Sequence, residues 1–117
     1  MDYWILQSDI KKRGVEHYSG PSLASELAFR PPETNNLKWE YGDMANTVEV
    51  VSSVNEAIDH IHQYGSKLSD VIITEDKETM DKFLKSVDSA CVFANCSSRM
   101  SDGYRLGLGK VYLSMWT

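Results

Sequence analysis

The chain has 117 residues, of which 42% are hydrophobic and 25% are charged, and its formal net charge at pH 7 is −5. This length and composition predict a single soluble domain. The acidic balance argues against a nucleic-acid partner, because binding to a phosphate backbone needs a basic surface. No apolar run has the length of a membrane span, and the N-terminus lacks the residue order of a secretory signal, so we expect an intracellular protein.

The first third of the chain has a weaker pattern than the rest. Apolar residues from Ile5 to Val15 indicate a helix followed by a strand, and Gly20–Pro21 indicates a turn. A short helix is expected around residues 23–27, ended by Pro31 and Pro32. Residues 33–43 then form a polar connection.

A regular pattern begins at residue 47. Thr47 to Val51 is typical of a strand, and Ser53 with Glu56 has the spacing of a capping box at the start of a helix. Gly65 ends this helix, and residues 71–73 form a short β-branched run. The order strand, helix, strand follows.

A second helix and another strand extend this unit. Apolar residues at 80, 83, 84 and 87 have helical spacing, with Thr74 or Asp76 as the N-cap. Ala90 to Ala94 is a compact apolar strand. Residues 47–95 therefore predict a βαβαβ unit of the α/β class, with a mostly parallel sheet and flanking helices. Ligands of such sheets bind beyond the carboxyl ends of the strands.

The run NCSSRMSDGYRLGLG, from Asn95 to Gly109, lies at this predicted position. Small hydroxyl residues and glycines free backbone N–H groups, and Arg99 adds a planar charged fork. Together they can hold a carboxylate or a phosphate. The same residue types are also the usual turn formers, so an ordinary long loop is the alternative.

Other reactive residues give weaker signals. His60 and His62 are two apart on a predicted helix and point to different faces, so surface histidines are expected rather than a metal pair. Cys91 lies in an apolar strand and is expected in the core. Cys96, close to Arg99, meets the local requirements of a nucleophile.

Glu40 is a second binding candidate, because a carboxylate before a strand can accept hydrogen bonds from a ribose or from an amine. A capped loop is the alternative. No GxGxxG fingerprint occurs, since Gly103, Gly107 and Gly109 have a different spacing and no amphipathic helix behind them. The sequence thus contains no complete dinucleotide-binding domain.

Several blocks together resemble the γ-glutamyl phosphate reductase family of the aldehyde dehydrogenase superfamily, which also forms the C-terminal enzyme of bifunctional Δ1-pyrroline-5-carboxylate synthases. The blocks, in chain order, are a weaker SGPSLASELAF from Ser19, EYGD at 40–43, VEVVSSVNEAIDHIHQYGS at 48–66, DVIITEDKET at 70–79 and FLKSVDSACVFANCSSRMSDGYRLGLG at 83–109. The last block looks closer to the animal synthase than to the separate bacterial enzyme. If the chain comes from an animal bifunctional synthase, the resemblance implies a mitochondrial protein; if not, it implies a cytoplasmic one.

The resemblance implies an aldehyde-dehydrogenase-like catalytic domain that reduces γ-glutamyl phosphate to glutamate-5-semialdehyde with NADPH, in proline biosynthesis. It implies a small-molecule substrate and a homo-oligomeric parent. The implied cofactor contact is Glu40, although it stands one place nearer Gly42 than the family motif has it. The implied substrate-binding residues are Asn95, Ser97, Ser98, Arg99, Asp102 and Gly103.

Two departures from the family limit this implication. The PAACNALE-like motif that carries the nucleophilic cysteine does not occur, and Cys96 is not its counterpart, so no catalytic residue and no metal ligand is predicted. We expect residues 1–109 to be a partial C-terminal region of the catalytic domain and 110–117 (KVYLSMWT) to be a tail foreign to the family. Such a fragment would be inactive alone. The alternative function is a non-catalytic module that docks on full-length subunits.

Overall fold

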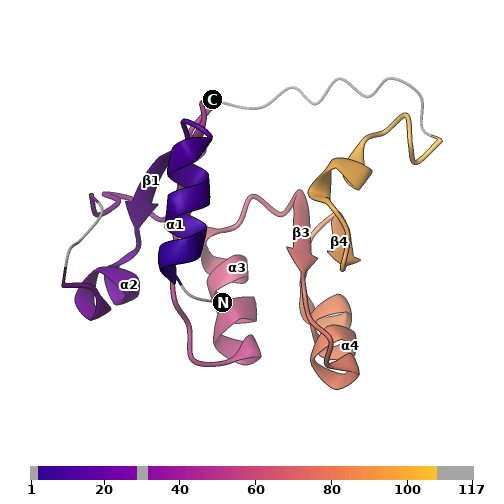
Figure 1. Cartoon of the computed structure of the whole chain (residues 1–117). Coiled ribbons are helices and arrows are strands. Elements are labelled where there is room, and N and C mark those ends of the chain that lie inside the picture. Colours follow the sequence, from indigo (N-terminus) through magenta and orange to yellow (C-terminus); the bar gives the residue numbers. More distant parts are fainter. Residues whose placement is uncertain (1–2, 29–31, 108–117) are drawn as a thin grey trace. The chain divides into compact units, whose positions relative to one another are not determined.

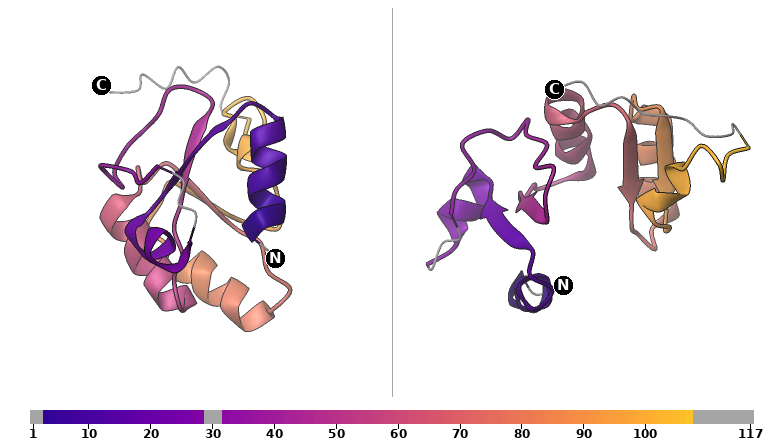
Figure 2. Two further views of the ribbon diagram at one scale, coloured as in Figure 1. Left: turned by 60° about the vertical axis from the view of Figure 1, so that its left-hand side comes forward. Right: turned by 90° about the horizontal axis from the view of Figure 1, so that it is seen from above.

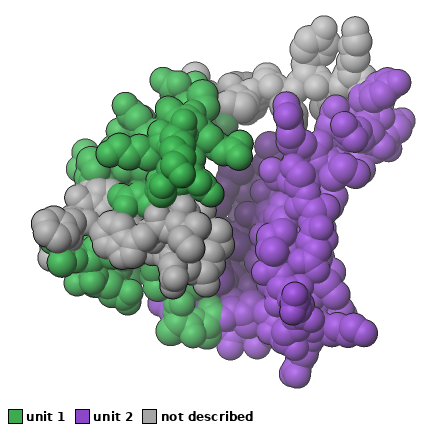
Figure 3. Space-filling view, viewed as in Figure 1, with its two compact units in different colours: residues 1–53 green, residues 54–117 purple. Residues whose placement is uncertain are grey.

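The computed structural model describes residues 3–28 and 32–107 (Figure 1). The chain divides into two compact units, residues 1–53 and residues 54–117 (Figure 3), and the predicted single domain stays a prediction. The predicted tail at 110–117 lies outside the described residues. In each unit a two-stranded parallel sheet is combined with helices, and this confirms the α/β class.

The first unit contains helix α1 (Tyr3–Lys12), strand β1 (Glu16–Ser19), helix α2 (Pro21–Glu26) and strand β2 (Ala45–Val48). The predicted helix, strand and short helix are confirmed. β1 and β2 are parallel, with Glu16 opposite Ala45 and Ser19 opposite Val48. Pro21 occupies the first turn of α2, where its missing N–H costs no helical hydrogen bond.

Strand β2 begins and ends earlier than the predicted Thr47 to Val51. The cause is Glu49, which leaves the sheet and caps α2. Its carboxylate accepts hydrogen bonds from the backbone N–H of Ser22 at 3.1 Å and of Leu23 at 2.9 Å. Any Cβ at Gly20 would collide with this carboxylate, so the close approach requires glycine there.

The second unit contains helix α3 (Val54–Tyr64), strand β3 (Ser69–Ile72), helix α4 (Lys77–Ser86), strand β4 (Cys91–Ala94) and the 3₁₀ turn η1 (Ser98–Ser101). β3 and β4 lie side by side and are parallel (Figure 2). Ser69 is opposite Cys91 in their register. The order β2, α3, β3, α4, β4 is the predicted one. The four described strands pair as β1 with β2 and β3 with β4, and not as one continuous sheet.

The core of the second unit lies between its helices and its sheet. Ile58, Phe83 and Val87 are buried, and Val54, Ile61, Ile72 and Val92 pack against them. Phe83 is only 3% exposed. Two apolar residues of the predicted elements are outside this cluster. Leu84 of the helical pattern is 38% exposed. Cys91, expected in the core, is half-buried, because every position of β4 is partly accessible in this small sheet.

Candidate functional site

The carboxyl ends of β3 and β4 meet at one edge of their sheet, as parallel strands require. β3 ends at Ile72 and β4 ends at Ala94. The backbone N–H of Asn95 donates to the carbonyl of Ile72 at 2.8 Å and continues the ladder by one residue. The run that begins at Asn95 therefore starts at the edge where the sequence predicted it.

The side chain of Asn95 is occupied by the neighbouring loop. Its Nδ2 donates to the carbonyl oxygen of Thr74 at 3.0 Å, and its Oδ1 accepts from the backbone N–H of Thr74 at 2.9 Å. Asn95 has a φ of 55°, in the left-handed region that asparagine tolerates better than most residues. Asn95 thus joins the loop after β4 to the loop after β3.

The residues that follow Asn95 form local turns. The Ser97 Oγ caps η1 by accepting from the backbone N–H of Arg99 at 3.3 Å. Asp102 Oδ1 accepts from the backbone N–H of Tyr104 at 3.1 Å, and Gly103 between them is half-buried. The η1 turn contacts β3. Ser97 and Asp102 therefore use their side chains to shape the loop.

Arg99 and Ser98 are the candidate residues with free polar groups. Both are exposed, and among the described residues neither the guanidinium of Arg99 nor the hydroxyl of Ser98 has a hydrogen-bond or ion-pair partner. A guanidinium presents five N–H donors in a planar fork that matches a carboxylate or a phosphate. Arg99 is therefore the residue best able to bind an anion among the six loop candidates.

An open cavity of about 700 Å³ lies at the same edge of the sheet. Its lining combines the apolar side chains of Ile73 and Met80 with polar groups of Thr74, Glu75, Lys77 and Asn95. Ile73 is 76% exposed there. Helix α4 begins beside this cavity, where Asp76 Oδ2 caps the backbone N–H of Thr79 at 2.9 Å. Hydrogen bonding from the side chain and then from the backbone of Thr79 lowers the pKa of Asp76.

Glu40, the candidate cofactor contact, belongs to the first unit and is exposed. The next residue, Tyr41, stacks on Tyr18 with ring centroids 5.3 Å apart, and its hydroxyl is hydrogen-bonded to Thr47. The Tyr18 hydroxyl donates to Glu16 at 3.0 Å, and this hydrogen bond raises the pKa of Tyr18. Packed aromatic residues thus hold the backbone from which Glu40 projects.

The remaining sequence candidates have no common site. Cys96 is half-buried, and Cys91 and Cys96 are both free thiols. His60 packs against Tyr64, and His62 is exposed. Residues 3–28 and 32–107 contain no group of three histidine, cysteine or acidic side chains placed to hold a metal ion. No helix in these ranges could cross a membrane.

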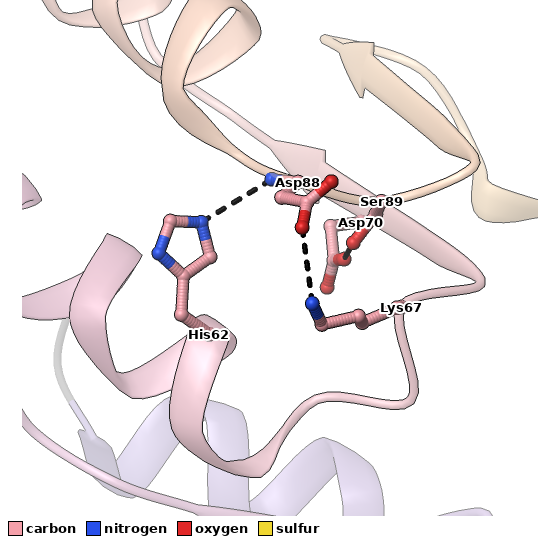
Figure 4. A network of polar contacts seen from close by, with 5 residues as sticks. All are labelled: His62, Lys67, Asp70, Asp88 and Ser89. Carbon is pink, nitrogen blue, oxygen red and sulfur yellow. Dashed lines mark hydrogen bonds and ion pairs between the residues drawn. The ribbon is translucent and has the colours of Figure 1, made fainter.

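A polar network that the sequence did not predict lies at the amino-terminal edge of the β3–β4 sheet (Figure 4). Lys67 Nζ pairs with Asp88 Oδ2 at 3.0 Å, and His62 Nε2 accepts from the backbone N–H of Asp88 at 3.2 Å. Ser89 Oγ donates to Asp70 Oδ2 at 2.5 Å. The hydrogen bond and charge of Lys67 lower the pKa of Asp88. The partners are 19 to 26 residues apart, so no local pattern reveals them.

The chain was compared with known proteins. No family model matches it. It is 52% identical over 101 residues to a Δ1-pyrroline-5-carboxylate synthase of Solanum lycopersicum, and 43% identical over 103 residues to a γ-glutamyl phosphate reductase of Trichodesmium erythraeum. The chain is homologous to a segment of these enzymes. The match covers 86% of the chain in both cases, and 14% of the synthase and 24% of the reductase.

Solved γ-glutamyl phosphate reductases have the same fold in the matching segment. The enzyme of Thermotoga maritima superposes with a TM-score of 0.82 at 32% identity, over 91% of this chain and 26% of that one. The enzyme of Saccharomyces cerevisiae superposes with a TM-score of 0.65 at 24% identity, which shows the fold alone. The predicted resemblance to γ-glutamyl phosphate reductase is thereby confirmed. Its closer likeness to the animal synthase stays a prediction.

Proposed function

We propose that this chain provides the substrate-side loop of a glutamate-5-semialdehyde dehydrogenase, which reduces γ-glutamyl phosphate to glutamate-5-semialdehyde in proline biosynthesis. The 52% identity over 101 residues to a pyrroline-5-carboxylate synthase is the observation that carries this proposal. The guanidinium of Arg99 at the carboxyl edge of the β3–β4 sheet supports it, because this guanidinium has no partner in the part of the chain that the structure describes and the substrate carries both a carboxylate and a phosphate.

Each loop residue has a separate part in this proposal. Arg99 binds an anionic group of the substrate, and the Ser98 hydroxyl donates a further hydrogen bond. Ser97 and Asp102 keep the loop in shape through their turns, with Gly103 between them. The reaction also needs a nucleophile, and we propose that Cys96 does not supply it, because no general base in the described part of the chain is paired with this half-buried thiol.

NADPH supplies the hydride when it is bound to the complete enzyme. Glu40 is exposed, and its carboxylate can accept hydrogen bonds from a ribose. Among the described residues no glycine-rich turn joins a strand to a helix as a pyrophosphate site would require. In the ranges 3–28 and 32–107 we therefore propose Glu40 as a ribose contact without a full cofactor cradle, and we propose that the isolated chain has no dehydrogenase activity.

A chimera tests this function. Residues 1–107 of this chain replace the matching segment of the Thermotoga maritima reductase, and NADP⁺-dependent oxidation of glutamate-5-semialdehyde is measured in the presence of phosphate. We expect an active chimera that loses activity about a hundredfold on Arg99→Ala and keeps it on Lys82→Ala, a matched loss of exposed charge on α4. A folded chimera without activity, or equal effects of both changes, would contradict the proposal.

Exposed apolar side chains favour a second candidate function, which is docking on full-length subunits. Ile73, directly after β3, is 76% exposed, and Tyr104, within the run that starts at Asn95, is 79% exposed. Such side chains are typical of interaction surfaces. Co-purification of the tagged chain with a full-length synthase, abolished by Ile73→Asp with Tyr104→Asp, would support docking. A chain that stays monomeric in the presence of the synthase would exclude it.

A further inference from the structure

We infer that Asn95 is a positioning residue that fixes the Arg99 turn through the backbone of Thr74, and that it is not itself a ligand of the substrate. This inference rests on the proposed anion-binding function of the loop. Both polar atoms of the Asn95 carboxamide bond the backbone of Thr74, Nδ2 to the carbonyl oxygen at 3.0 Å and Oδ1 to the N–H at 2.9 Å. The Nδ2 atom also lies 4.0 Å from the Met80 sulfur of helix α4. The carboxamide imitates a peptide group and adds one more pair of ladder hydrogen bonds after the strands have ended.

Only asparagine meets both demands of this position. Its carboxamide has a donor and an acceptor side by side, whereas an aspartate could only accept and would face the Thr74 carbonyl without a hydrogen. Asparagine also tolerates the observed φ of 55°, which is unfavourable for branched side chains. Glycine would accept this backbone conformation but would lose both hydrogen bonds.

The contact at Thr74 extends into helix α4. Thr74 Oγ1 accepts from the backbone N–H of Asp76 at 3.1 Å, and Asp76 Oδ2 accepts from the backbone N–H of Thr79 at 2.9 Å. A chain of hydrogen bonds thus runs from Asn95 to the first turn of α4. Helix α4 is in turn held by buried Phe83, so the loop is tied to the core of its unit.

The contact between Asn95 and Thr74 also determines where the turn that contains Arg99 begins. The N–H of Asn95 is bonded to Ile72, its carboxamide is bonded to Thr74, and Ser97 caps the Arg99 N–H two residues further on. With residue 95 fixed by three hydrogen bonds, few conformations remain for the short stretch to Arg99. Binding of an anion then orders less of the loop and costs less entropy.

The test uses the complete 117-residue chain and inorganic phosphate as the probe. Amide hydrogen exchange of Thr74 reports the Asn95 contact, and the side-chain NMR resonance of Arg99 reports phosphate binding. We expect Asn95→Gly, which suits the left-handed backbone, to raise Thr74 exchange about tenfold and to weaken phosphate binding by a similar factor, with the thermal midpoint little changed. Asn55→Ala removes an exposed, unpaired carboxamide from α3 and serves as the control, with neither effect.

The possible failures are distinguishable. If phosphate shifts the Arg99 resonance equally in the wild type and in Asn95→Gly, Asn95 does not position the turn, and this inference is overturned while the proposed function stands. If Thr74 exchange does not change in Asn95→Gly, the carboxamide contact is absent, with the same consequence. If the wild-type chain binds no phosphate at Arg99, the proposed anion loop fails, and the positioning role fails with it.

Discussion

The two edges of the β3–β4 sheet use similar residues in different ways. At the amino-terminal edge, the charges of Lys67 and Asp88 pair with each other at 3.0 Å. At the carboxyl edge, Asn95 and Ser97 satisfy backbone groups, and the guanidinium of Arg99 has no partner among the described residues. Both edges are exposed, so exposure alone does not separate them.

This difference supports the proposal that the carboxyl edge, and not the amino-terminal edge, binds the anion. A cation that already has a carboxylate partner gains little from a second anion, whereas an unpaired guanidinium can use its full set of donors on a ligand. The side chains around Arg99 shape the loop without neutralising the arginine. We therefore propose a structural role for the edge of Lys67 and a binding role for the edge of Arg99.

The largest effect is expected from a mutation in the hydrophobic core that supports both edges of the sheet. Phe83 of α4 is 3% exposed in the core of the second unit, and Phe83→Ala should lower the free energy of unfolding by about 3–5 kcal/mol. Denaturant unfolding followed by fluorescence measures this loss. Hydrogen exchange should rise at Thr74 and at Asp88 together. A rise at one edge alone would show that the edges do not depend on one core.

The next largest effect is expected from a mutation that changes anion binding at the carboxyl edge alone. Arg99→Ala should weaken binding of inorganic phosphate by about tenfold or more, because hydrogen bonds to charged groups are the strong ones, and should leave the stability unchanged. Isothermal titration measures the affinity. Arg105→Ala removes the same charge from the same run and is the control. An equal loss in Arg105→Ala would indicate diffuse attraction and contradict a specific role of Arg99.

The smallest effect concerns the pH dependence of the amino-terminal edge. Lys67 lowers the pKa of Asp88 below its ordinary 3.8, so the folded state binds this proton less readily than the unfolded state. The pair therefore stabilises the fold above pH 3.8, and this contribution is lost as the pH falls through the lower folded pKa. Asp88→Asn should lower the thermal midpoint slightly at pH 7 and leave it unchanged near pH 2. A difference that is constant with pH would contradict the pairing.

Much of the fold could be predicted from local patterns. The helices around Ile58 and Phe83 follow from apolar residues at helical spacing, and Asp76 follows from its place before α4. The end of β2 could not be predicted. The hydrophobic run continues to Val51, but Glu49 leaves the sheet to cap α2, whose N-terminus lies 26 residues earlier in the chain.

The position of the candidate site could be predicted from the sequence, but the contacts that its residues make could not. Chain order and parallel pairing put the run from Asn95 at the carboxyl edge of the sheet. The contact between Asn95 and Thr74 spans 21 residues, so sequence alone suggested a ligand residue where the structure shows a link between two loops. His62 likewise meets Asp88 only after α3 and β4 are in position.

One NMR titration tests the contrast between the two edges most directly. Inorganic phosphate is added to the complete chain while the side-chain resonances of Arg99 and Lys67 are followed in the same sample. The account predicts a saturable shift of the Arg99 resonance and no shift of the Lys67 resonance, because the Lys67 ammonium already forms an ion pair with Asp88. Equal shifts of both residues, or a shift of Lys67 alone, would contradict the assignment of the binding role to the carboxyl edge.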